Sequence, residues 1–229
     1  MTPTSPPPSH QPVRQILGRH PSGVLLGAQF VTVLAYPFLS DSTIGRSVIG
    51  VAQMCVVLLA VWAVRRTPAF TWIVAVIAVP AMAFTVMEAV SPHTDWIVLT
   101  SALLHAPFYF YVSYAMIRYL FHDDKVTTDE LYATGAAFTV VAWGFAYVFA
   151  AAQVVWPDSF IGADGETGRT WFELLFLSFS TLTSVGLSDI VPVQEHARSL
   201  LMIEMVAGVL YVALVVARLV GLTVRRAER

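Results

Sequence analysis

The sequence predicts an all-α membrane protein with six transmembrane helices per chain and a short re-entrant helix between the fifth and the sixth. Hydrophobic residues make up 57% of the 229 residues and charged residues only 12%, which is about half the charged fraction of an ordinary soluble domain. The mean hydropathy is +0.70. Six apolar segments have roughly the length of a membrane span, and a seventh is too short to be one. Lipid must therefore replace water around much of the surface.

The six segments are identified by their length. A helix needs about 20 apolar residues to cross roughly 30 Å of hydrocarbon, because each residue rises about 1.5 Å. The segments that approach this length are 23–40, 47–64, 69–90, 96–121, 131–156 and 197–224. Pro80 and Pro107 fall inside two of them, and membrane helices tolerate proline where neighbours satisfy the freed carbonyls.

The basic residues predict the orientation of the chain. With six spans, all but three of the 13 Lys and Arg residues fall on one side. These are Arg14, Arg19, Arg65, Arg66, Arg118, Lys125, Arg218, Arg225, Arg226 and Arg229. The other side has Arg46, Arg169 and Arg198 and collects acidic residues: Asp41, Asp95, Asp158, Asp164, Glu166, Asp189 and Glu195. Because basic residues stay in the cytoplasm, we expect both termini to be cytoplasmic and the protein to lie in the cell (plasma) membrane.

The chain divides into four predicted parts. Residues 1–22 are rich in Pro and Ser, which predicts a disordered cytoplasmic tail. A four-span region follows at 23–122, then a two-span unit at 127–224 and a short cytoplasmic tail at 225–229. The boundary is set by a capping box, in which Thr127 caps a helix and Glu130 reaches back to it.

Several classes of function are disfavoured by composition. The formal net charge of −2 argues against a nucleic-acid partner. Cys55 is the only cysteine, so no intrachain disulfide or cysteine-based metal site is expected. No nucleophile, catalytic dyad or metal cluster lies within the spans, and we expect neither an enzyme nor a bound cofactor.

The segment between the last two spans carries the functional signal. Residues 170–182, TWFELLFLSFSTL, are too few to cross a bilayer and too apolar for a solvated loop. They are followed by TSVGLSD at 183–189. Non-helical backbone at membrane depth is allowed only where protein buries it or where it lines water. Its carbonyls need a partner, and a dehydrated cation is a suitable one.

Here the sequence resembles the potassium-channel superfamily, a class of tetrameric pore-loop cation channels, over roughly residues 127–222. Ser184, Val185, Gly186 and Asp189 occupy the positions of Thr, Val, the first Gly and Asp in the filter signature Thr-Val-Gly-Tyr-Gly-Asp. The resemblance implies a homotetramer in which rings of carbonyls replace the hydration shell of K⁺. Residues 184–188 would coordinate the monovalent cation, and Thr183 and Asp189 would support the filter.

The filter departs from the family pattern at two positions. Leu187 replaces an aromatic residue, and Ser188 replaces a glycine that has a positive φ in the family. Ser188 is therefore strained by about 1–2 kcal/mol, or the backbone follows another path. Phe176 and Leu177 stand where the family has tryptophans that bond to the aromatic residue, so we expect an apolar cuff around the filter. A weakly selective sodium–potassium channel is the alternative to a potassium channel.

The last span contains two residues of interest. Gly208 matches the hinge glycine of the family's inner helix, and glycine costs a helix about 1 kcal/mol relative to alanine. We interpret it as a gating hinge, with close helix packing as the alternative. Glu204 lies one turn earlier; we favour packing against Ser180 or Thr181 over a position facing the inner cavity.

The four-span region lacks the charges of a voltage sensor. Arg118 carries the only formal charge between Trp96 and Tyr119, so the fourth span has no basic residue at every third position. A lone His105 in this span is more often a hydrogen-bonded packing residue than a metal ligand. The remaining alternative is a non-conducting membrane receptor or transporter, in which this region does the work.

Overall fold

The computed structural model describes residues 21–64, 68–92, 94–121 and 127–227. Residues 1–20 of the predicted N-terminal tail, the predicted link at 122–126 and the last two residues of the C-terminal tail lie outside the described residues. So do six of the basic residues used for the orientation: Arg14, Arg19, Arg65, Arg66, Lys125 and Arg229.

The described part is almost entirely helical, as the sequence predicts. The long helices are α2 (Pro21–Leu39), α3 (Thr43–Val64), α4 (Pro68–Val90), α5 (Asp95–Leu120), α6 (Thr128–Val155) and α8 (Glu195–Ala227). The short helix α7 spans Trp171–Leu182, and two-residue strands β1 (Phe160–Ile161) and β2 (Val191–Pro192) flank it. Among the described residues, α2, α5, α6 and α8 are long and apolar enough to cross a membrane.

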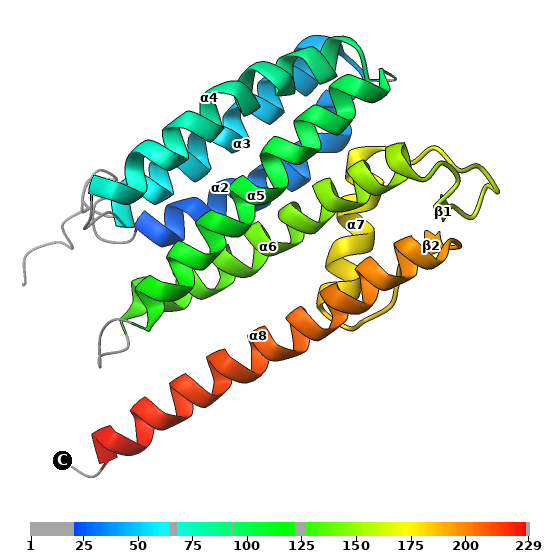
Figure 1. The fold of residues 1–229 in the computed structure, drawn as a ribbon. Helices are drawn as coiled ribbons and strands as arrows, with labels where there is room; N and C mark the ends of the chain where they lie inside the picture. The colour runs from blue at the N-terminus through cyan, green and yellow to red at the C-terminus, as the bar shows by residue number, and fades with distance from the viewer. Residues whose placement is uncertain (1–20, 65–67, 93, 122–126, 228–229) are drawn as a thin grey trace, which may run out of the picture.

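Helices α2 to α6 run alongside one another as a bundle, and α8 lies beside α6 (Figure 1). The short helix α7 lies between α6 and α8 at a steep angle to both (Figure 1). The start of α2 and the end of α8 are at the same end of the bundle (Figure 1). This arrangement follows because the six long helices of the described residues alternate in direction.

The core lies mainly between α5 and α6, where small residues let large ones pack. On α6, Ala133, Ala136 and Ala146 are fully buried. Opposite them, Tyr109 of α5 meets the ring of Trp143 edge-on, with the ring centroids 5.7 Å apart. Because lipid gives no hydrophobic drive for helices to associate, close contact of this kind is what holds membrane helices together.

The two predicted helix boundaries near residue 127 and residue 22 have different outcomes. The capping box is confirmed: Thr127 accepts from the backbone of Glu130, and the Glu130 carboxylate accepts from the backbone of Thr127.

The predicted boundary of the N-terminal tail at residue 22 is wrong by two residues, because α2 already begins at Pro21. The physical reason is a tertiary contact that satisfies the helix start, since Ser22 donates from its N–H and hydroxyl to the Asp129 carboxylate, at 3.0 and 2.9 Å. At the other end, α8 extends to Ala227 and includes part of the predicted 225–229 tail.

A buried polar network links α4 to α5, and it confirms the packing interpretation of His105. The His105 ring is 1% exposed, with Nε2 3.0 Å from the hydroxyl of Thr85 and Nδ1 2.7 Å from the carbonyl of Ser101. The hydroxyl of Ser101 donates to Glu88 at 2.6 Å. Each polar group in such a network needs its partner, because an unpaired buried group costs about 1–3 kcal/mol.

Enlarging a buried alanine of α6 tests the close packing. We expect Ala146→Leu to destabilise the protein by about 1–3 kcal/mol, because added methylenes in a filled core force side chains and backbone to move. The thermal midpoint in detergent measures the change. Ala83→Leu on the exposed side of α4 is the matched control. Equal midpoints for the two variants would contradict this account of the core.

Candidate functional site

The candidate site is the segment 183–190, which connects the end of α7 to β2. Helix α7 starts near the end of α6, and the chain returns through this segment to the same region (Figure 1). The return is fixed by antiparallel pairing of β1 with β2, in which Phe160 faces Pro192 and Ile161 faces Val191. Ile190 is buried at the outer end, so both ends of the segment are anchored in the protein.

The segment follows an unusual backbone path. Thr183 is the C-cap of α7 and donates its hydroxyl to the carbonyl of Phe179 at 2.6 Å. Ser184 and Gly186 then have positive φ values of 57° and 70°. Glycine adopts this conformation freely, whereas Ser184 pays about 1–2 kcal/mol for it. Something in the surrounding structure must offset that cost.

The compensation is a set of hydrogen bonds from the segment to the end of α7. The N–H of Ser184 donates to the carbonyl of Thr181 at 3.0 Å, and those of Val185 and Gly186 donate to the carbonyl of Ser180 at 3.1 and 3.2 Å. The N–H of Ser188 donates to the Ser180 hydroxyl at 3.0 Å. A net contribution of about 0.5–1.5 kcal/mol per bond exceeds the strain at Ser184.

Unlike the N–H groups, the carbonyls of residues 184–187 in the same segment accept no hydrogen bonds in the described part of the chain. All four of these residues are exposed, including the side chains of Val185 and Leu187 at 59% and 75%. The segment therefore turns its donors toward its own helix and leaves its acceptors for something outside the chain.

Ser188, which stands at the position of the family's second glycine, does not have the positive φ of that glycine. Among the described residues only Asp158 and Ser184 are non-glycine residues with positive φ. The backbone at Ser188 therefore follows another path and is not strained in the expected way. Ser188 instead uses its side chain, which accepts from the N–H of Ile190 at 3.1 Å. The outer half of the segment thus follows its own path, held by serine hydroxyls.

The residues expected to form an apolar cuff differ in their exposure. Leu177 is buried at 3%, but Phe176 is 48% exposed and Leu187 is 75% exposed. The side chains of Leu187 and Phe176 are therefore not enclosed by the described part of the chain, and the cuff stays a prediction. Asp189 is also exposed and follows the segment at its outer end.

Glu204 packs behind the short helix, as favoured, but its partner differs from the residues expected. It is completely buried and contacts the hydroxyl of Ser178 on α7. That hydroxyl also lies 2.9 Å from the carbonyl of Ala142 on α6. Ser178 and Glu204 therefore join α6, α7 and α8 at one point. Among the described residues, the hydrogen bonds of Glu204 include none with Ser180 or Thr181, and the Ser180 hydroxyl accepts from the N–H of Ser188 instead.

Gly208 is required by close packing. A Cβ built at this position would collide with the backbone carbonyl of Leu182, the last residue of α7. Helix α8 is continuous from Glu195 to Ala227. The glycine thus brings α8 against the base of the 183–190 segment, whether or not the helix also bends there. The hinge stays a prediction.

A cluster at the start of α7 was not foreseen from the sequence. Arg169 is buried and forms ion pairs at 3.2 Å with Asp164 and with Glu173. The N–H and carbonyl of Arg169 also bond to the Gln153 side chain of α6. Hydrogen bonds from the backbone of Glu166 and from Arg169 hold the pKa of Asp164 below its usual range. Its contribution to stability is therefore present above its ordinary pKa and is lost as the pH falls through the lowered value.

The sequence did carry part of the signal for this cluster. Thr170 and Glu173 have the spacing of a capping box, and both of its bonds are formed. The sequence, by contrast, has no pattern that indicates a supporting role for Ser180. Only the fold brings the Ser180 hydroxyl to the N–H of Ser188.

Comparison with known proteins supports the resemblance. Residues 135–225 match the family model described as an ion channel, the two-helix channel domain of the potassium-channel family. No curated protein and no solved structure matches the chain.

The matched region runs from α6 to α8 and includes α7 with the 183–190 segment. This match supports assignment of the region from α6 to α8 to the ion-channel domain of the potassium-channel superfamily. It is a multi-pass membrane protein with an ion-channel domain.

Removing the Ser180 hydroxyl tests its role under the segment. We expect Ser180→Ala to raise the exchange rate of the Ser188 amide hydrogen by at least about tenfold, because that N–H loses its bond. Hydrogen exchange by mass spectrometry measures this. Thr183→Val is the control, since the Thr183 hydroxyl bonds only to helix carbonyls. Unchanged exchange in Ser180→Ala would show that the bond does not hold the segment.

A methyl group at Gly208 tests the contact between α8 and α7. We expect Gly208→Ala to lower the thermal midpoint although alanine is the better helix former, because its Cβ meets the Leu182 carbonyl. Gly221→Ala, where a Cβ would meet nothing, is the control and is expected to raise or keep the midpoint. Stabilisation by both substitutions would contradict the close contact.

Proposed function

We propose that the chain is one subunit of a homotetrameric channel that conducts monovalent cations passively, with potassium as the preferred ion. The observation that carries the proposal is the polarity of the 183–190 segment. Its N–H groups bond to α7, whereas the carbonyls of residues 184–187 have no hydrogen-bond partner in the described part of the chain. Four such segments around one axis would offer rings of oxygens that replace the hydration shell of an ion.

The exposure of α8 favours assembly of several chains. Apolar side chains lie exposed on many faces of this helix, among them Met202, Met205, Val206, Val209 and Leu210. One side can face lipid, but α8 also touches the base of the candidate filter through Gly208. In a tetramer, α8 would line the pore on one face and pack against a neighbouring subunit on another.

The proposed subunit has six spans, comprising the four candidate spans and the helices α3 and α4. These two helices have 22 and 23 residues, enough to cross a bilayer. With both ends of the chain in the cytoplasm of a plasma-membrane protein, the 183–190 segment would open to the outside. The acidic residues Asp158, Asp164 and Glu166 would there raise the local concentration of cations.

Weak selectivity between sodium and potassium is the second candidate, and one observation favours it. The outer half of the segment has no positive φ at Ser188, and Leu187 is 75% exposed, so little of the described chain covers the side chain that would fix the diameter. A filter held by serine hydroxyls can still be rigid, so the choice between the two depends on the neighbouring subunits.

Ion flux in liposomes tests the proposal. We expect purified protein to give potassium flux, with a reversal potential in mixed gradients that follows potassium. Gly186→Val should abolish the flux, since a β-branched residue at φ 70° is strained. A wild-type flux equal to that of Gly186→Val, or a monomeric mass in detergent, would contradict the channel and favour a receptor or transporter.

The double variant Leu187→Tyr with Ser188→Gly separates the two selectivities. If the altered segment makes the filter permissive, the double variant should lower the sodium permeability relative to potassium by at least about tenfold. Equal permeability ratios in both proteins would show that these two residues do not set selectivity.

A further inference from the structure

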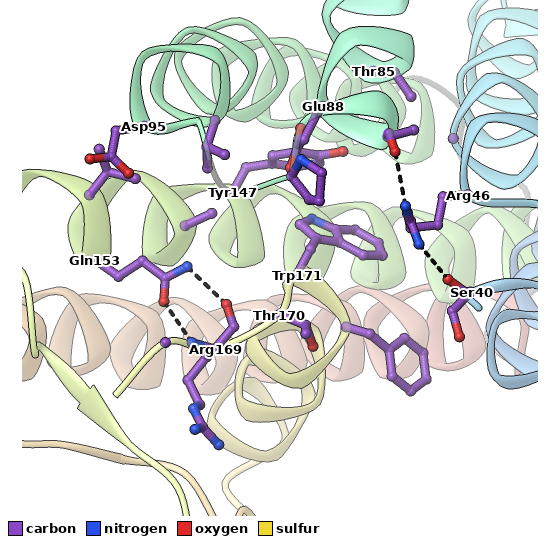
Figure 2. Close-up of a pocket in the computed structure, with 18 of the residues that line it drawn as sticks. Ser40, Arg46, Thr85, Glu88, Asp95, Tyr147, Gln153, Arg169, Thr170 and Trp171 are labelled. Carbon is purple, nitrogen blue, oxygen red and sulfur yellow. Dashed lines mark hydrogen bonds between the residues drawn. The ribbon is translucent and has the colours of Figure 1, made fainter. Parts of the chain in front are cut away.

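A cavity of about 810 Å³ lies apart from the candidate filter, between the four-span region and the start of α7 (Figure 2). Helices α2 to α6 and the loop before α7 all contribute to its lining. Its volume lies within the range of about 300–1,000 Å³ that is typical of small-molecule sites. The candidate filter is not part of its lining.

Aromatic rings from three elements form one wall of this cavity. Tyr36 of α2 stacks on Phe172 of α7, with centroids 4.2 Å apart and planes 6° from parallel. Trp171 lies against Tyr36 and against Tyr147 of α6, with centroids 6.2 and 5.5 Å apart. The faces of such rings attract cations, most strongly in a site that excludes water.

A carboxylate without a basic partner lies on the same lining. Glu88 accepts one hydrogen bond, from the hydroxyl of Ser101 at 2.6 Å, and forms no ion pair within the described residues. Figure 2 shows Glu88, Tyr147 and Trp171 among the lining residues. A carboxylate that is shielded from water is stabilised by a cation close to it.

The two arginines of the lining make contacts of their own, although the Nε of Arg46 is buried without a hydrogen-bond partner in the described residues. Arg46 donates to the carbonyls of Ser40 and Ala89, at 2.9 and 3.0 Å. Arg169 is paired with acidic residues outside the cavity, and its guanidinium points away from Glu88 and Trp171 (Figure 2).

The remaining charges of the lining are mostly negative. Asp95 and Asp158 lie on the lining besides Glu88, and Arg46 is the one cation there without an acidic partner in the described part of the chain. The lining therefore favours a positively charged ligand.

We propose that this cavity binds a small organic ammonium ion with an apolar body. Glu88 would neutralise the ammonium group, and the rings of Tyr36, Tyr147 and Trp171 would contact its methyl or methylene groups. An inorganic cation fits less well, because it needs several oxygen ligands at once. An anionic ligand would be repelled by Glu88, Asp95 and Asp158, and Arg46 alone would offset these three negative charges.

The position of the cavity gives such a ligand a means to act on the filter, a step that rests on the proposed channel function. Trp171 and Phe172 are the first two residues of α7, and the last turn of the same helix holds the 183–190 segment through Ser180. A ligand that contacts the start of α7 therefore biases the position of the helix to which the filter is attached.

Calorimetric titration of the full-length protein in detergent with benzyltrimethylammonium chloride tests the site. We expect saturable binding that Glu88→Gln weakens at least about tenfold. Asp41→Asn is the matched control: it removes an exposed carboxylate at the same end of the bundle but outside the cavity, and its affinity should stay within about twofold of the wild type. Potassium chloride is kept constant throughout.

A second variant guards against a fold defect in Glu88→Gln. Val98 lies half-buried on the cavity lining, so Val98→Trp should fill the space and abolish binding while the thermal midpoint stays close to that of the wild type. Binding that all variants retain would place the probe elsewhere, such as at the ion pathway, and would overturn the site, as would no binding by the wild type.

Flux measurements separate this proposal from the channel function. If wild-type liposomes conduct, the probe should change the flux, and Glu88→Gln should shift its half-effective concentration at least about tenfold. Absent flux together with Glu88-dependent binding would defeat the channel but not the site. Flux that the probe changes equally in both proteins would defeat the coupling.

Discussion

A backbone segment that leaves a helix inside a membrane protein must find partners for its N–H groups within the protein, because hydrocarbon offers none. Here the partner is the last turn of α7. The carbonyls of Ser180 and Thr181 and the Ser180 hydroxyl accept from the N–H groups of residues 184, 185, 186 and 188. With the donors satisfied on one side, the free carbonyls belong to the other side, and the segment gains a polarity that suits cations.

The rest of the C-terminal region follows from that constraint. Ser184 adopts a positive φ because the bonds to α7 outweigh the strain. Gly208 lets α8 approach the Leu182 carbonyl at the base of the segment. Ser178 and Glu204 then fix α7 between α6 and α8, and the β1–β2 pair fixes the outer end of the segment. Each contact positions α7, and α7 positions the carbonyls.

The two ends of α7 connect regions that the sequence keeps apart. Its last turn carries the 183–190 segment, and its first turn, with Trp171 and Phe172, meets Tyr36 of α2 and Tyr147 of α6. The N-terminal helices α2 to α5 lack the regularly spaced charges of a voltage sensor. The aromatic contact of α2 with α7 and the cavity beside it give these helices a physical link to the candidate filter that does not depend on such charges.

The sequence by itself determined the helices and the place of the candidate filter, because span length, apolar composition and the Thr127 capping box are local properties of the chain. It also indicated Ser184, Val185 and Gly186 as candidate filter residues, since the motif is contiguous. Only the tertiary structure decided that Ser180 supports Ser188, that Ser178 receives Glu204, and that Gly208 meets Leu182. These pairs join different helices or the two ends of a turn, and no local pattern encodes how far one helix slides or rotates against the next.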